Sequence, residues 1–161
     1  MTRNHKLLGA GAAAALALAA IPAIATPGSG FTAVDTWKGV FGPIEVKAED
    51  GDLELELKSR GNTDLYVVRN EVAAGGTSGW HRHPGPSLIT VTKGEITAYE
   101  STDPACAPIV YAAGQGFVDH GDHAHMLRNE TDEPAETVAV QFLAPGAGRR
   151  IDVARPGHCP A

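Results

Sequence analysis

Short β-rich runs separated by glycine and proline are the feature that most constrains how this chain can fold. Gly75-Gly76, Pro84-Gly85-Pro86 and Pro145-Gly146 are typical of the gaps between these runs. Such residues form turns and interrupt both helices and strands. Between them we find no convincing amphipathic helical pattern. Many short strands at regular spacing favour a β-sandwich or a β-barrel, so we expect an all-β fold.

Several segments have the composition or alternation of strands. Leu53–Lys58 alternates leucine with charged residues, which predicts a half-buried strand with its leucines on one face. Ser87–Thr92 and Glu95–Tyr99 are β-rich and meet at Lys93-Gly94, as in a hairpin. Further strands are expected at Leu65–Val72, Pro108–Tyr111, Gly116–Val118, His123–Leu127, Glu136–Leu143 and Arg149–Val153.

The N-terminus has the pattern of a secretory signal peptide. Arg3 and Lys6 precede an alanine-rich apolar run, and Ala23 and Ala25 provide small residues before Thr26. We expect residues 1–25 to be the signal peptide and residues 26–161 to be a single domain. An uncleaved membrane anchor is the alternative, although Pro22 and two glycines shorten the apolar run. The predicted destination is the periplasm, the cell envelope or the medium.

The charge of the expected mature chain excludes some partners. The whole chain has 13 basic and 19 acidic residues, and cleavage removes two basic residues and no acid, leaving 11 against 19. With histidine neutral, the mature chain therefore carries a net charge of −8. An acidic chain without a basic cluster is a poor candidate for binding nucleic acid or anionic lipid. No second apolar stretch is long enough to span a membrane after cleavage.

Both cysteines, Cys106 and Cys159, lie in the expected mature chain. In an oxidising compartment two thiols usually pair, so we expect a disulfide between them. It would close a loop of about 50 residues, worth about 4 kcal/mol in the chain-entropy model. Two free thiols or a metal-binding role are the alternatives, and the two cysteines do not have CxxC spacing.

Five of the six histidines in the expected mature chain form two groups, and the sixth, His158, lies in the tail. The first group is His81 and His83, and the second is His120, His123 and His125. Residues two apart on a strand point to the same face, so each H-x-H pair can direct both imidazoles at one ion. Two such pairs on facing strands of a barrel would supply three or four nitrogens to one metal. The alternative is that these histidines are ordinary surface residues.

The first histidine pair lies in a segment that resembles one motif of the cupin family. That motif is a glycine, five residues, H-x-H, three or four residues, a glutamate, six residues and a glycine. Gly75, His81, His83 and Gly94 stand at the matching positions, and Ser87 occupies the position of the glutamate. The spacing fits at both ends and only the acid is missing.

The second histidine group resembles the other cupin motif, a glycine, five residues, P-x-G, two residues, a histidine, three residues and an asparagine. Gly114 begins the match, and His125 and Asn129 provide the closing H-x3-N. Asp119-His120-Gly121-Asp122 replaces the P-x-G turn, with one extra residue between the glycine of this turn and the histidine. The resemblance covers residues 65–143. It implies a double-stranded β-helix (jelly-roll) barrel, often dimeric, so a homodimer is an expected partner.

The resemblance also implies one divalent transition metal, which could be Fe, Zn, Mn, Cu or Ni. Carried over residue by residue, the expected ligands are His81, His83 and His125. Ser87 is a much weaker ligand than a carboxylate, which leaves the rest of the coordination to water or substrate. His123 is our first choice for a fourth ligand by strand alternation, with His120, Asp122 and Glu95 as alternatives. The loss of the acid is also compatible with a site that no longer holds metal.

Two further residues are candidates for the pocket. Gln141 lies among apolar residues in a predicted strand and would need a partner if it points inward, whereas Phe117 would serve either as pocket lining or as core. We expect a metal-dependent enzyme acting on a small molecule, of the dioxygenase or isomerase type. A non-catalytic module that binds a small ligand or a metal is the main alternative, and a purely structural role is a third. The sequence does not decide whether the chain is an enzyme.

Overall fold

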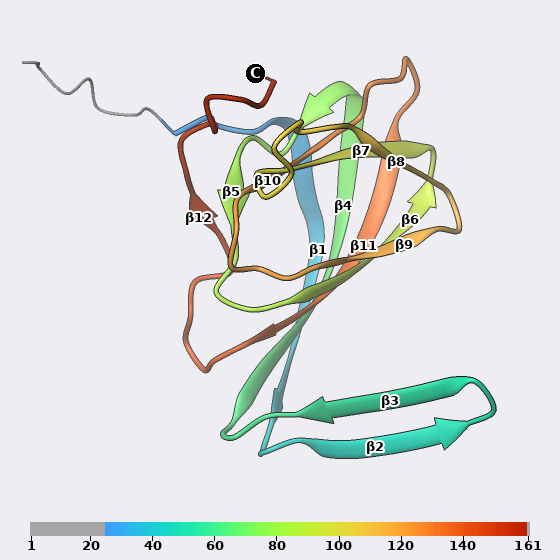
Figure 1. The fold of residues 1–161 in the computed structure, drawn as a ribbon, viewed down its shortest axis with the longest axis vertical. Coiled ribbons are helices and arrows are strands. Elements are labelled where there is room, and N and C mark those ends of the chain that lie inside the picture. Colours follow the sequence, from blue (N-terminus) through green and yellow to red (C-terminus); the bar gives the residue numbers. More distant parts are fainter. Residues whose placement is uncertain (1–24, 161) are drawn as a thin grey trace, which may run out of the picture.

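The computed structural model describes residues 25–160. The predicted signal peptide lies outside these residues except for Ala25. In the described part the regular structure consists of strands, and no helix there is long and apolar enough to cross a membrane. The expected all-β fold is confirmed (Figure 1).

Twelve strands follow one another along the chain. They are β1 (Ser29–Phe41), β2 (Glu45–Asp50), β3 (Leu53–Lys58), β4 (Thr63–Thr77), β5 (His81–Arg82), β6 (Ser87–Lys93), β7 (Glu95–Glu100), β8 (Ile109–Ala112), β9 (Gly116–Asp119), β10 (His125–Arg128), β11 (Ala135–Leu143) and β12 (Ile151–Asp152).

Ten of these strands form two faces of a barrel. One face has the order β1-β4-β11-β6-β9, and the other has the order β12-β5-β10-β7-β8. The faces are joined where β10 pairs with the end of β4, at Arg128 and Thr77. All pairings are antiparallel, and non-consecutive strands lie next to each other. This is the expected jelly-roll arrangement of a double-stranded β-helix.

The main core lies between the two faces. Alternate residues of β6 and β11 are buried, because successive side chains of a strand point to opposite sides of a sheet. The buried apolar side chains are Val72, Ile89, Val91, Ile96, Ala98, Leu127, Ala135 and Ala139. Partly buried Phe31, Tyr111 and Phe117 pack against them. The strands β5 and β10, which carry histidines, therefore belong to a barrel face that is backed by this core.

A second cluster lies on the outer side of β5, β7 and β10. Trp80, Tyr99 and Met126 pack there with the disulfide between Cys106 and Cys159. Trp80 is fully buried, and its indole N–H donates to the carbonyl oxygen of Pro160 at 3.2 Å. The predicted disulfide is therefore present, and it holds the C-terminal tail over Trp80.

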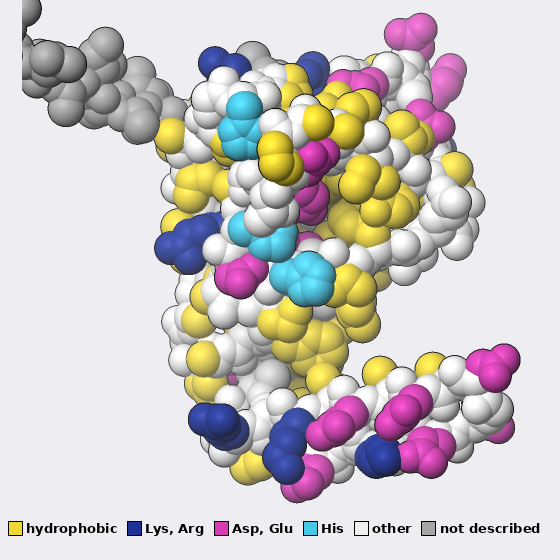
Figure 2. Space-filling view, viewed as in Figure 1, with side chains coloured by type: hydrophobic (Ala, Val, Ile, Leu, Met, Phe, Trp, Pro, Cys, Tyr) yellow, Lys and Arg dark blue, Asp and Glu magenta, His cyan; other side chains and the backbone are white. Residues whose placement is uncertain are grey.

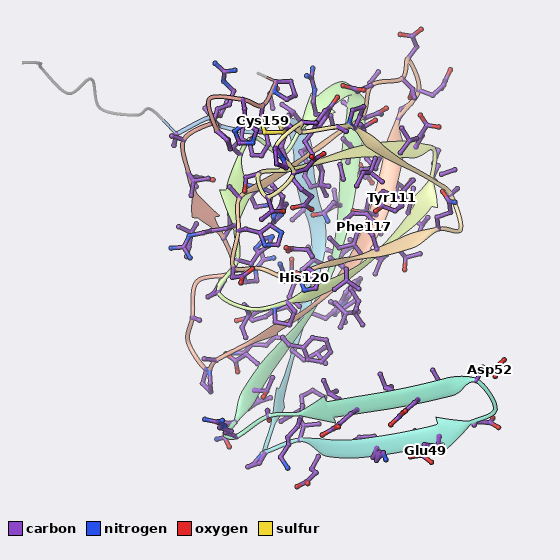
Figure 3. All side chains as sticks on the ribbon, in the orientation of Figure 1. Glu49, Asp52, Tyr111, Phe117, His120 and Cys159 are labelled. Carbon is purple, nitrogen blue, oxygen red and sulfur yellow. A yellow bond between two sulfur atoms is a disulfide. The ribbon has the colours of Figure 1, made fainter. Side chains whose placement is uncertain are left out.

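The hairpin of β2 and β3 corrects one expectation from the sequence. The strand at Leu53–Lys58 forms, but it is not half-buried: Leu53 is 57% exposed and Leu55 is 50% exposed. The two strands pair only with each other and project away from the barrel (Figures 1 and 2). Glu49 and Asp52 lie near the far end of the hairpin (Figure 3). The alternation predicted the strand correctly, but it carried no information on whether anything would cover the leucines.

Candidate metal centre

Strand pairing brings the first two histidines together. His81 begins β5 and His125 begins β10, and the two residues are direct partners in the antiparallel register. Their ring centroids lie 4.3 Å apart, and both side chains are buried. Alternation turns these two rings to the inside of the barrel, while the neighbouring Trp80 and Met126 point to the outer cluster.

The third histidine, His83, lies just beyond the end of β5. Its backbone N–H donates to the carbonyl oxygen of Gly121 at 2.9 Å, which fixes the loop against the turn between β9 and β10. Gly121 has φ of +86°, and a Cβ there would lie 2.2 Å from the oxygen of Gly85, so this close approach requires glycine. The ring of His83 lies 4.8 Å from that of His81 and 5.2 Å from that of His125, measured between centroids.

The hydrogen bonds of the three rings determine which nitrogens are available. Nδ1 of His81 lies 2.9 Å from the carbonyl oxygen of Gly79, and Nδ1 of His83 contacts that of Arg149. Nδ1 of His125 lies 3.4 Å from the carbonyl oxygen of His123. A carbonyl oxygen only accepts, so each Nδ1 carries the proton and each Nε2 keeps its lone pair. Nε2 of His125 is buried without a hydrogen-bond partner.

Burial keeps two of these imidazoles neutral. Burial, together with the nearby His125, lowers the pKa of His81 to about 2. Burial likewise lowers the pKa of His125 to about 4, against the opposing effect of Asp119. Neutral imidazole is the form that binds a metal. The three side chains offer ligand atoms that all lie within 4.8 Å of one another, so this donor set fits a divalent transition metal.

Ser87 and Asp119 lie beside the histidines. Ser87, at the position of the motif's glutamate, is fully buried, and its Oγ has no hydrogen-bond partner. Asp119 is its direct partner in the β6–β9 register and is 1% exposed. We did not single out Asp119 from the sequence as a site residue. The signal for it was the alternation of β9, which turns Phe117 and Asp119 to the same side of the sheet.

The structure does not bring the other candidate ligands to the cluster. Nε2 of His123 lies 3.0 Å from Oε2 of Glu100, and its Nδ1 lies 2.8 Å from Oδ1 of Asp122. We expected His123 to share a face with His125, but β10 begins only at His125 and His123 belongs to the preceding turn. His120, labelled in Figure 3, is exposed, and its ring lies 6.0 Å from that of His123.

A cavity of about 370 Å³ opens onto the three histidines. Gln141, 5% exposed, contributes to its wall, and its Oε1 lies 3.5 Å from Nη1 of Arg149. Phe117 is not part of this wall, because its ring stacks on Tyr111 at 4.4 Å and packs against the core (Figure 3). The other side chains that line the cavity near the histidines include Phe31, Val68, Asn70, Ser87, Ile89, Leu127 and Thr137.

Comparison with known proteins gives one family and several similar folds. The family model of the cupin domain (Cupin_2) matches residues 68–141. No curated protein matches the chain. An uncharacterised conserved protein with a double-stranded β-helix domain from Klebsiella pneumoniae subsp. pneumoniae MGH 78578 is 20% identical over 71% of this chain and 86% of that chain, with a TM-score of 0.48.

Two further solved structures are similar over shorter parts. The polyketide cyclase RemF from Streptomyces resistomycificus is 13% identical over 58% of this chain and 63% of that chain, with a TM-score of 0.49. A Cupin 2 conserved barrel domain protein from Salinispora arenicola CNS-205 is 25% identical over 50% of this chain and 64% of that chain, with a TM-score of 0.45.

The family model runs from within β4 to within β11 and includes all three clustered histidines. It agrees with the two histidine motifs and with the double-stranded β-helix. Residues 68–141 therefore have the sequence pattern and the fold of a cupin domain.

Proposed function

We propose that this protein holds one divalent transition metal through His81, His83 and His125 and acts on a small molecule bound in the adjacent cavity. The observation that carries the proposal is the convergence of three buried imidazoles at the cavity wall, each with its Nδ1 directed at a backbone carbonyl. Backbone carbonyls in these positions orient the rings and fix the tautomer that leaves Nε2 free for a metal.

A bound ion would supply Lewis acidity toward an oxygen of the substrate. The chain's own residues bind and orient the rest of the molecule. Gln141 and Asn70 provide amide groups, and Asn70 is itself held by a 3.1 Å hydrogen bond from its Nδ2 to Oγ1 of Thr137. The apolar side chains of Val68, Ile89 and Leu127 line another part of the same cavity. A dioxygenase or an isomerase is the reaction class that we propose for this arrangement.

Arg149 favours a substrate with an acidic group. It lines the cavity, and its guanidinium lies 5.6 Å from the ring centroid of Tyr66 and 3.5 Å from Oε1 of Gln141. Within residues 25–160 no carboxylate forms an ion pair with it. Arg150 also lines the cavity but is already paired with Asp152 at 2.6 Å. A small carboxylic acid would give Arg149 the charged partner that it lacks.

The second candidate is a non-catalytic module that binds a small ligand or a metal. The specific observation in its favour is Ser87, a neutral residue at the position where the family has glutamate. For either function we propose that residues 1–25 direct a single domain out of the cytoplasm. The disulfide supports this location, since such bonds persist mainly in oxidising compartments.

The test is to load the protein with Fe²⁺, Mn²⁺, Ni²⁺ or Zn²⁺ and incubate it with a panel of small carboxylic acids. Product formation is followed by mass spectrometry, and oxygen consumption by an electrode. We expect turnover that is lost in His81→Ala and kept in His120→Ala, the exposed control. Saturable binding without turnover would favour the non-catalytic module. If the metal-loaded protein neither binds nor converts any of these acids, both candidate functions are contradicted.

A further inference from the structure

We propose that Asp119 supplies the carboxylate of this metal site, in place of the glutamate that Ser87 replaces. The inference rests on the proposed function, because it concerns the same metal. It goes further by relocating the acidic ligand from β6 to the neighbouring strand β9.

The strand register provides the first argument. Ser87 and Asp119 are direct partners in the antiparallel pairing of β6 with β9. Side chains of directly opposed residues lie on the same side of a sheet, with Cβ atoms about 5 Å apart. The carboxylate of Asp119 therefore lies on the same side of the sheet as a carboxylate at position 87 would, and it can reach the same space beside the histidines.

The contacts of the two carboxylate oxygens provide the second argument. Oδ1 of Asp119 accepts the backbone N–H of Gly121 at 2.8 Å and lies 3.4 Å from Nδ1 of His125. Oδ2 lies 3.5 Å from Nε2 of His83 and makes no hydrogen bond. Two ligand atoms on a tetrahedral ion stand about 3.4 Å apart, given metal–ligand distances of about 2.1 Å. Oδ2 and Nε2 of His83 thus have the separation of neighbouring ligands.

The missing counter-charge provides the third argument. Asp119 is 1% exposed, and no lysine or arginine within residues 25–160 pairs with it. A buried carboxylate without a cation is strongly destabilising, so buried charges are normally paired or bound to a metal. A divalent ion between Asp119 and the histidines would provide this positive charge.

Asp119 approaches the cluster from the side of His83 and His125. It is not part of the tight group in which the ligand atoms of the three histidines lie within 4.8 Å of one another. Its backbone position is nevertheless fixed, because the hydrogen bond to Gly121 holds the turn that also binds the backbone of His83. An asparagine at this position keeps the acceptor for Gly121 and removes only the charge.

The experiment is a Co²⁺ titration of the metal-free protein, followed by its visible absorption bands and by calorimetry. We expect Asp119→Asn to weaken Co²⁺ binding at least tenfold and to change the absorption bands, while Asp122→Asn, an exposed acid of the same turn, changes neither. Adding Ser87→Glu to Asp119→Asn restores an acid at the family position, and we expect it to recover most of the lost affinity.

The outcomes separate this inference from the proposed function. Wild-type protein that binds no Co²⁺ overturns the metal site itself. Wild-type and Asp119→Asn proteins with equal affinity and equal spectra overturn only the role of Asp119. Thermal melts of the metal-free variants show whether Asp119→Asn impairs folding. If it does, the Ser87→Glu/Asp119→Asn protein tests the role of Asp119: restored Co²⁺ affinity supports the relocated acid, and affinity that is not restored contradicts it.

Discussion

The disulfide between Cys106 and Cys159 should contribute a large share of the stability of this fold. The bonded residues are separated by 53 positions, so the bond closes a long loop in the unfolded chain. In the chain-entropy model a loop of this length corresponds to about 4 kcal/mol. For a domain of this size, such a loss lowers the melting temperature by about 10–15 °C.

The structure also predicts a local effect of removing this bond. The tail that it anchors covers Trp80, which donates its indole N–H to Pro160 and is 0% exposed. Inside the tail, Nη1 of Arg155 donates to the carbonyl oxygen of Cys159 at 2.8 Å, a bond that does not reach the barrel. Without the disulfide, the tail is expected to leave Trp80 and expose the indole to water.

The assay is guanidinium unfolding followed by tryptophan fluorescence in a Trp37→Phe background, so that Trp80 is the only reporter. Oxidised protein is compared with reduced protein and with Cys106→Ala/Cys159→Ala. Reduction removes the bond but keeps both sulfur atoms, so it separates the bond from the lost volume. If reduced protein unfolds within about 1 kcal/mol of the oxidised form and Trp80 emission does not shift to the red, the reasoning is refuted.

Three further predictions concern protonation, the hairpin and the turn after β10. Burial lowers the pKa of His81 to about 2 and that of His125 to about 4, whereas histidine in the unfolded chain has a pKa of about 6.5. Below pH 6.5 the unfolded chain therefore binds more protons than the folded one, and the unfolding free energy of the metal-free protein should fall as the pH is lowered from 6.5 toward 4. An unfolding free energy that stays constant over this range in urea melts would contradict this. Leu53→Ser or Leu55→Ser in the exposed hairpin should change the unfolding free energy by less than about 0.5 kcal/mol. Ile96→Ala, which truncates a side chain with 0% exposure, should lower it by about 2–5 kcal/mol. Equal losses in denaturant melts would mean that the leucines are covered in solution. Asn129→Ala should lower the unfolding free energy by about 2–3 kcal/mol in the same melts, because the buried amide donates to the carbonyl oxygens of Val72, Ala73 and Glu133. A loss below about 0.5 kcal/mol would show that these hydrogen bonds contribute little to stability.

Much of the barrel could be predicted because its strands alternate with obvious turns. Glu136–Leu143 was predicted as a strand, and β11 occupies it with only one additional residue, with alternate side chains buried against β4 and β6. β1 was not identified from the sequence, although it pairs along most of β4. Its side chains are largely exposed, so it lacks the apolar alternation by which the other strands were recognised.

The candidate site could be predicted in part. The H-x-H of His81 and His83 and the H-x3-N of His125 and Asn129 were sufficient to select the three histidines that meet in space. His123 was misplaced because alternation applies only inside a strand, and residue 123 lies in a turn. Asp119 was not recognised, because its proximity to the histidines depends on the pairing of β9 with β6, which the sequence alone does not give.

The most direct test of the metal site is elemental analysis of the purified protein, for wild type, His81→Ala and His120→Ala. The structure predicts about one equivalent of a single transition metal in wild type and His120→Ala, and a loss of that metal in His81→Ala. The absence of metal from wild-type protein, or an equal metal content in wild type and His81→Ala, would contradict the assignment of His81, His83 and His125 as the metal ligands.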